Sequence, residues 1–178
     1  MSVVQGEESQ GKTSQDERWM EQALLLAERA AELDEVPVGA LVVLDGEVIG
    51  EGWNRPISGC DPTAHAEILA LRDAAARVGN YRLVGADLYV TIEPCSMCAG
   101  AIVHARIRRV VFGASEPKAG VVASRGAFFD QPWLNHRVLW QGGVLGQRCS
   151  ERISEFFARR REQKRLEREL KRSRDEEL

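Results

Sequence analysis

Two short segments of the sequence carry the residue types of a metal centre. Cys95 and Cys98 lie three positions apart in TIEPCSMCAG, and His65 and Glu67 lie upstream in DPTAHAEILAL. Thiolate and imidazole are common zinc ligands, and a glutamate beside them can move protons. A Cys-x-x-Cys pair occurs in redox disulfides, in structural zinc sites and in catalytic zinc sites. The number of further ligands therefore decides between these three kinds of site.

Both segments are expected to open helices. Pro94 precedes a predicted helix over 95–105, and Asp61 caps one over 62–78 with proline at its first position. Cysteines at i and i+3 lie on one face of a helical turn, so both sulfurs can reach one metal ion. The positive ends of the two helix dipoles favour thiolate over thiol. We therefore expect the histidine to supply a third ligand at the two helix N-termini.

Three protein ligands indicate a catalytic site rather than a structural one. A structural zinc site has four protein ligands, whereas a catalytic site leaves one position for water, which becomes acidic and nucleophilic there. Glu67 follows His65 by two residues, which on a helix flank would point it away from the metal. At a helix N-terminus this objection weakens, and Glu67 is expected to act as general acid and base. The alternative is a surface glutamate that only favours the helix dipole.

The remaining segments predict an α/β protein with a mixed sheet covered by helices. Apolar residues at helical spacing predict a helix from Asp16, and Asp45-Gly46 between two β-branched runs predicts a hairpin. The long segment 114–135 shows no period, and its aromatic residues favour anchoring to the core slightly over contact with substrate. The other predicted elements are strands over 86–92, 108–113 and 136–144 and a last helix from Gln147.

Length and composition place the chain among ordinary globular proteins. The chain has 178 residues, of which 44% are hydrophobic, and a net charge of −3, which suits a single domain. We expect no secretory signal and no membrane span, so the default expectation is a cytoplasmic location. We expect a disordered arm over 1–15, a domain over 16–161 and a charged helical extension over 162–178. The extension is basic but also contains glutamates, so a solvated face and an RNA-binding face are both open. Four residues are interpreted as structural: Cys60, Cys149, His104 and His136.

Taken together, His65-Ala66-Glu67 and Pro94-Cys95-Ser96-Met97-Cys98 resemble the signature of zinc-dependent nucleobase deaminases. Further segments, including GWNRPI, NYRLVGADLYVTIEPCSMCAGAI and RRVVFGA, are similar to bacterial tRNA adenosine deaminases over residues 16–161. That family implies a three-layer α/β/α fold of the cytidine deaminase kind with a mixed five-stranded sheet. It also implies a homodimer, one zinc ion per chain, and a tRNA anticodon stem-loop as substrate. A zinc-activated water would replace the amine of the wobble adenosine, giving inosine and ammonia.

The resemblance also assigns roles to residues. It makes Glu67 the proton shuttle, makes His65, Cys95 and Cys98 the zinc ligands, and gives Asn54 a hydrogen bond to the purine ring. Asn54 is alternatively an ordinary turn residue before a proline. The sequence departs from the family pattern at 115–120, which reads SEPKAG, so contacts of Glu116 to the RNA are less secure than the zinc site. The remaining expected substrate contacts are Val36, Pro37, Ala66, Phe157, Arg160 and Arg161.

Three alternatives stay open at this point. A deaminase of a free base or nucleoside, of the guanine or cytosine type, would share the zinc chemistry without needing the arginines. A non-catalytic zinc subunit that binds tRNA would have no use for Glu67. A thioredoxin-like redox pair would leave the His-Ala-Glu segment unexplained.

Overall fold

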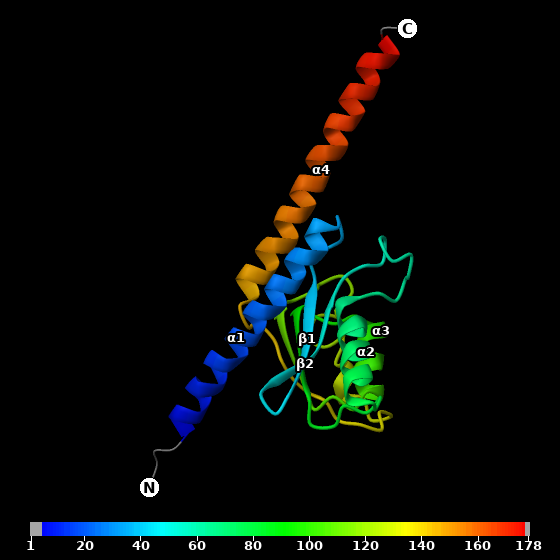
Figure 1. Cartoon of the computed structure of the whole chain (residues 1–178). Helices are drawn as coiled ribbons and strands as arrows, with labels where there is room; N and C mark the ends of the chain where they lie inside the picture. The colour runs from blue at the N-terminus through cyan, green and yellow to red at the C-terminus, as the bar shows by residue number, and fades with distance from the viewer. Residues whose placement is uncertain (1–4, 177–178) are drawn as a thin grey trace.

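A computed structural model of the chain describes residues 5–176, with side chains over 15–174. Figure 1 shows a sheet with two helices on each face. None of the described helices is long and apolar enough to cross a bilayer. In chain order the elements are α1 (Gln5–Glu32), β1 (Gly39–Leu44), β2 (Glu47–Trp53), α2 (Ala66–Val78), β3 (Asp87–Ile92), α3 (Ser96–His104), β4 (Arg109–Ala114), the 3₁₀ turn η1 (Phe128–Asp130), β5 (Leu139–Gln141) and α4 (Gly146–Glu176).

The sheet is mixed and five-stranded, as expected, with strand order β2-β1-β3-β4-β5. β1 pairs antiparallel with both β2 and β3, whereas β3, β4 and β5 run parallel. The predicted hairpin joins β1 to β2 through Asp45 and Gly46, whose φ values of 51° and 81° are those of a tight type I′ turn. The carboxyl end of β3 therefore leads directly into the Cys-x-x-Cys segment, next to β1.

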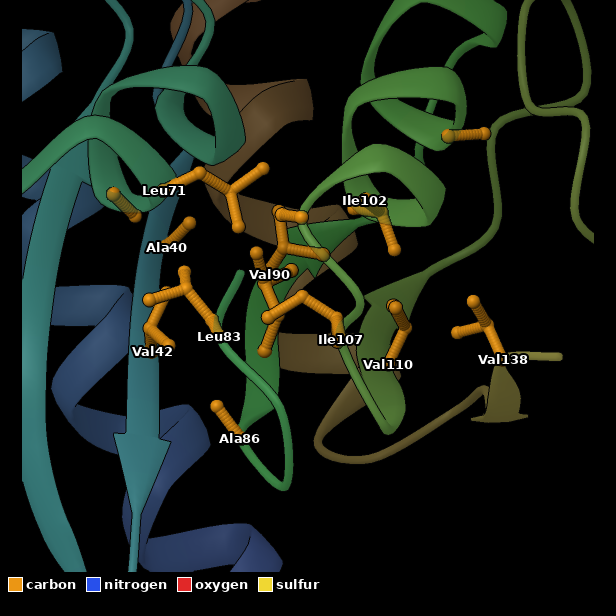
Figure 2. Close-up of a cluster of buried hydrophobic side chains, with 14 of the residues drawn as sticks. Ala40, Val42, Leu71, Leu83, Ala86, Val90, Ile102, Ile107, Val110 and Val138 are labelled. Carbon is orange, nitrogen blue, oxygen red and sulfur yellow. The ribbon is translucent and has the colours of Figure 1, made fainter. Parts of the chain in front are cut away.

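The alternation of side chains along the strands builds a core on each face of the sheet. On β1, Ala40 and Val42 face α2 and α3, whereas Leu41 and Val43 face α1. Figure 2 shows the first core, in which Ala40, Val42 and Val90 of the sheet meet Leu71 of α2 and Ile102 of α3. This packing gives the three-layer α/β/α arrangement that the family resemblance implied.

A buried polar network fixes α1 against the sheet. Asp16 is 2% exposed and accepts hydrogen bonds from the hydroxyl of Tyr89 at 2.7 Å and from the guanidinium of Arg109 at 3.1 and 2.5 Å. Arg109 also donates to Gln141 at 2.6 Å. The network joins α1 to β3, β4 and β5, and each buried charge in it has a partner of opposite charge.

Three predicted elements differ in their bounds from the structure, and one of them is the strand predicted over 136–144, of which only β5, Leu139–Gln141, forms. Residues 1–15 were expected to form a disordered arm, but α1 begins at Gln5 because the Glu, Gln and Lys residues there continue the helix; residues 1–4 lie outside the described residues. α2 begins at Ala66 rather than at residue 62. Asp61 accepts hydrogen bonds from the backbone N–H and hydroxyl of Thr63 at 2.8 and 2.7 Å, so it closes a local turn and does not cap the helix.

The long segment between β4 and β5 is anchored to the core mainly by one aromatic side chain. Phe129 in η1 is 1% exposed and belongs to the core under α3. Phe128 packs edge-on against both Phe129 and Trp133, with ring centroids 6.0 and 5.7 Å apart. Trp133 itself is 67% exposed. The anchoring interpretation therefore holds for the two phenylalanines, whereas Trp133 lies largely in solvent.

Candidate zinc-binding active site

His65 and Cys95 each occupy the residue immediately before a helix. His65 is the N-cap of α2, with φ −75° and ψ 152°, and Cys95 is the N-cap of α3, with φ −78° and ψ 174°. Both backbones are extended, and neither side chain makes the usual capping hydrogen bond. Their side chains are therefore free to bind something else. Cys98 lies in the first turn of α3 and is fully buried.

The three side chains meet at one point. His65 Nδ1 lies 3.7 Å from Cys95 Sγ and 3.6 Å from Cys98 Sγ, and all three ligand atoms lie within 4.8 Å of one another. With bonds of about 2.05 Å to nitrogen and about 2.3 Å to sulfur, a tetrahedral zinc ion holds such atoms about 3.6 Å apart. The spacing and the donor set, one imidazole and two thiols, therefore both fit zinc.

The site has three protein ligands and no disulfide. Among the residues whose side chains are described, the group contains no fourth histidine, cysteine or carboxylate. Cys95 and Cys98 are both free cysteines. The two arrangements that would exclude an open metal site, a fourth protein ligand and a Cys–Cys bridge, are thus both absent from the described structure. This is the ligand count of a catalytic zinc site.

Protonation of the three groups is linked. Hydrogen bonds from Cys98 and His65 lower the pKa of Cys95 to about 3, and the same bond to Cys95, with burial, raises the pKa of Cys98. The bond to Cys95 also raises the pKa of His65. These opposite shifts favour ionisation of Cys95 over that of Cys98. Binding a metal would release the remaining protons, as expected for ligands that must be deprotonated.

Glu67 is buried beside this centre and does not belong to its ligand set. It is the second residue of α2, is 3% exposed, and burial raises the pKa of its carboxyl to about 7. A glutamate that only favoured the helix dipole would lie in solvent, so burial argues against that alternative. Because His65 precedes the helix with an extended backbone, the two-residue spacing need not place the two side chains on opposite sides. The earlier objection from helical geometry therefore does not apply.

Asn54 connects β2 to the start of α2. Its Oδ1 accepts a hydrogen bond from the backbone N–H of Ala66 at 2.9 Å, and its own N–H donates to the carbonyl of Val38 at 3.0 Å. The close approach needs Gly52, where a Cβ atom would lie 2.3 Å from the Ala66 carbonyl oxygen. With Oδ1 occupied, the amide nitrogen of Asn54 points elsewhere and makes no hydrogen bond within the described part of the chain. Asn54 therefore fixes the start of α2 through Oδ1 and keeps its side-chain NH₂ group, with two N–H donors, for a ligand.

Glu93 is a site residue that sequence reasoning missed. It lies between the end of β3 at Ile92 and Pro94, and it is 2% exposed. Its Oε1 accepts from the backbone N–H groups of Ala123 and Ser124 at 2.7 and 2.8 Å, and its Oε2 accepts from Glu116 N–H at 3.0 Å and from the Ser124 hydroxyl. Burial alone would raise the pKa of Glu93, but these hydrogen bonds outweigh it and lower the pKa. Glu93 thus holds the segment after β4 against the Cys95 segment.

Glu35 is a second buried carboxylate outside the predicted site. It is 1% exposed, and its Oε1 accepts from Ser58 N–H at 2.6 Å in the segment between β2 and α2. It precedes Val36 and Pro37, two of the expected pocket residues. Pro37 also lines a hollow between α1 and α4. Glu35 belongs to the segment Glu35-Val36-Pro37-Val38, which resembles the pocket wall of the family, whereas the only sequence signal for Glu93 is its place directly before Pro94.

The structure brings together only part of the predicted substrate set. Asn54, Ala66 and the metal ligands surround the start of α2 and α3. The Oε1 of Glu116 accepts from Lys118 N–H at 2.9 Å, so this side chain folds back on its own loop. Phe157 is 44% exposed on α4, on the opposite face of the sheet from α2 and α3. Substrate contacts by Phe157, Arg160 and Arg161 therefore stay predictions.

The sequence matches a family model described as the cytidine and deoxycytidylate deaminase zinc-binding region over residues 13–114, more than half of the chain. The chain belongs to this deaminase family. The matched region contains His65, Cys95 and Cys98, the three side chains that are positioned to bind a metal ion, and it also contains Glu67.

Two relatives within this deaminase family are tRNA-specific adenosine deaminases. A tRNA-specific adenosine deaminase of Haemophilus influenzae is 54% identical over 159 residues, covering 89% of this chain and 92% of that protein. One from Agrobacterium fabrum is 49% identical over 143 residues, covering 80% and 94%.

Solved structures of deaminases share the fold. One from a study of A-to-I editing by tRNA:A34 deaminases is 50% identical with a TM-score of 0.74, covering 76% of this chain and 98% of that one. Guanine deaminase from Nitrosomonas europaea is 26% identical with a TM-score of 0.70, covering 80% and 84%. The fold is thus common to deaminases of different substrates.

Proposed function

We propose that the protein is a hydrolytic adenosine deaminase that converts the wobble adenosine of a tRNA anticodon loop to inosine. The observation that carries this proposal is the three-ligand centre of His65, Cys95 and Cys98 with Glu67 buried beside it. The assignment of tRNA as substrate is supported by sequence identity to relatives. The two tRNA-specific adenosine deaminases are 54% and 49% identical to this chain, whereas the guanine deaminase is 26% identical. We expect the enzyme to work in the cytoplasm as a homodimer, as the family resemblance implies.

Each residue of the site has a task in this reaction. His65, Cys95 and Cys98 would hold one zinc ion, which when bound makes a water molecule acidic enough to act as nucleophile near neutral pH. Glu67, with a pKa of about 7, can accept a proton from that water and return it to the purine ring. In the net reaction the water oxygen would bond to C6, the second water proton would pass through Glu67 to the amine, and the C6–N bond would break to release ammonia. The free amide N–H of Asn54 is available to orient the purine.

The adenosine must leave the anticodon stack to reach this site. The metal ligands are half-buried or buried, so a base held in a stack or duplex does not reach them. The protein has a net charge of −3, which argues against broad affinity for RNA through charge alone. Recognition must then depend on the shape of the loop and on local cationic patches.

Deamination of an anticodon stem-loop, compared with free adenosine, guanine and cytidine, tests the substrate. Conversion is read by sequencing, because inosine is read as guanosine. We expect the stem-loop to react and the free compounds to react poorly. If only the free compounds react, the RNA substrate is wrong and a free-base deaminase like the guanine deaminase is the better assignment.

Replacing Glu67 with glutamine tests the mechanism. The side chain keeps its size, so we expect folding and about one zinc per chain to be preserved. Turnover should fall by about 10²- to 10⁴-fold, the usual contribution of a positioned acid or base. Retained turnover would show that Glu67 is not the proton shuttle. Loss of zinc together with turnover would instead assign Glu67 to the metal site.

A further inference from the structure

The last part of α4 leaves the domain beyond Arg160. Arg159 lies 3.9 Å from Asp34, the last ion pair between α4 and the rest of the domain among the described residues, and Arg160 is half-buried. From Arg161 to Arg174 every side chain is exposed. Figure 1 shows this segment projecting beyond the domain at the end where α1 finishes and where the β2–α2 loop lies. It is therefore a free helix that emerges beside the predicted pocket wall, Val36 and Pro37.

This free helix carries a net positive charge, whereas the whole chain carries a net negative charge. Residues 161–174 contain seven cationic and three anionic side chains, although the protein carries a net charge of −3. Two of the three anions, Glu162 and Glu169, bind the same arginine, Arg165, at 2.6 and 2.7 Å. Among the residues with described side chains, none of the other six cations of this segment makes an ion pair, and three of the six are Lys164, Arg168 and Arg172.

These three cations lie on one face of the helix. Spacings of four and three residues bring side chains onto the same side, and Lys164, Arg168 and Arg172 follow Phe157 and Arg161 at such spacings. Like charges four residues apart destabilise an isolated helix, so a helix that only had to be solvated would alternate signs instead. A polyanion would remove this repulsion. We call Lys164, Arg168 and Arg172 the basic face.

We propose that the basic face binds the phosphodiester backbone of tRNA outside the anticodon loop. The inference rests on the proposed tRNA substrate and extends it, since Phe157 and Arg161, predicted to contact the loop, begin the same helix face. At a rise of about 1.5 Å per residue, Arg172 lies about 16 Å further along the helix than Arg161. A membrane surface is a poorer partner, because an interfacial helix needs a continuous apolar side and the segment offers only Leu166 and Leu170.

The test compares two double variants of the full-length zinc enzyme. Arg168→Gln/Arg172→Gln removes two cations of the basic face. Arg18→Gln/Arg174→Gln removes two exposed cations that lie off that face, one on α1 and one near the end of α4. Dissociation constants are measured with the inosine-containing product tRNA, so that no turnover occurs, and with a single-stranded oligonucleotide confined to the anticodon loop.

We expect the basic-face variant alone to weaken tRNA binding, with the loop oligonucleotide unaffected. Loss of two phosphate contacts should reduce the magnitude of the slope of log K against log salt by about 1.8. Raising the salt concentration from about 50 to about 200 mM would then weaken binding about tenfold less than it does in the wild type. Deamination of tRNA should show a raised KM with kcat unchanged. Wild-type protein should gain helical circular dichroism when tRNA binds, because the repulsion along the helix is relieved.

Four outcomes would overturn the inference. Equal losses in both double variants would mean that only net charge matters. Equal loss with the loop oligonucleotide would place the contact inside the loop. A change in oligomeric state on sedimentation, with tRNA binding intact, would make the helix a protein contact, and a selective loss of binding to anionic vesicles would make it a membrane contact. Each is distinct from failure of the proposed function, in which wild-type enzyme deaminates no RNA.

Discussion

Replacing Glu93 with glutamine would show how far one buried carboxylate holds the active-site loops together. Its two oxygens accept three backbone hydrogen bonds at 2.7, 2.8 and 3.0 Å, from Ala123, Ser124 and Glu116, and a fourth from the Ser124 hydroxyl. In glutamine one oxygen becomes an NH₂ group, which donates and cannot accept. The variant therefore keeps the shape of the side chain and reverses the polarity of one of its two ends.

The size of the effect follows from which end is reversed. At the Oε1 position the NH₂ group would face two backbone N–H groups. At the Oε2 position it would face only Glu116 N–H, since the Ser124 hydroxyl can rotate to accept. The second arrangement costs less, but it still leaves one buried N–H without an acceptor, which costs about 1–3 kcal/mol. The hydrogen bonds that remain to the side chain are also weakened, because the acceptor is no longer charged. We expect the free energy of unfolding to fall by about 3 kcal/mol and Tm to fall by about 6–12 °C.

The same carboxylate gives the effect a pH dependence. The pKa of Glu93 is lowered from its model-peptide value of 4.5 in the folded state, so its stabilisation is present above about pH 4.5 and is lost as pH falls through the lower folded pKa. Below that pH the protonated glutamate resembles glutamine. The difference in unfolding free energy between wild type and Glu93→Gln should therefore be full at pH 7 and shrink in acid.

Urea denaturation of the zinc-loaded protein at pH 7 and in acid measures this difference. Glu116→Gln is the matched control, because the Glu116 side chain accepts only from the neighbouring Lys118 N–H, at 2.9 Å; it should change the free energy of unfolding by less than about 1 kcal/mol. An unchanged stability in Glu93→Gln, or a loss that does not diminish in acid, would refute the reasoning that ionised Glu93 anchors the loop.

Four further predictions concern stability and metal. Asp16→Asn leaves the half-buried Arg109 with only the more distant carboxylate of Asp87, at 3.8 Å, so urea denaturation should show a loss of about 3 kcal/mol at neutral pH. Gly52→Ala would place a Cβ atom 2.3 Å from the Ala66 carbonyl oxygen and displace the start of α2, lowering stability by about 1–3 kcal/mol and lowering zinc content. Gly100→Ala, with no atom within 4 Å of the added Cβ, should instead be neutral or stabilise by about 0.5–1 kcal/mol. Removing zinc with a chelator should lower Tm in wild type and leave Tm unchanged in Cys95→Ala, because binding to the folded state alone adds stability.

The sequence predicted those parts of the structure that depend on local pattern. Runs rich in β-branched residues predicted the strands, of which the last is shorter than predicted. Asp45-Gly46 predicted the hairpin and the ligand count predicted an open metal site, and the structure contains both. The start of α2 was predicted too early, since a proline after an aspartate suits a helix N-terminus and a tight turn equally. Glu93 was missed because its partners lie 23 to 31 residues further along the chain, and no local pattern signals such contacts.

The residues that perform the chemistry do not explain the choice of substrate. Guanine deaminase from Nitrosomonas europaea shares this fold with a TM-score of 0.70 at 26% identity, so the arrangement of sheet and helices is compatible with other bases. His65 and Cys95 are placed by the two helix starts that this fold provides. Three segments are held differently from this shared framework: the loop held by Glu35, the loop held by Glu93 and the free end of α4. Buried carboxylates fix both loops and leave the outer sides of the loops exposed. Specificity for an RNA loop must therefore come from residues on those outer sides. Variants of these residues should alter KM for RNA before they alter zinc binding or kcat.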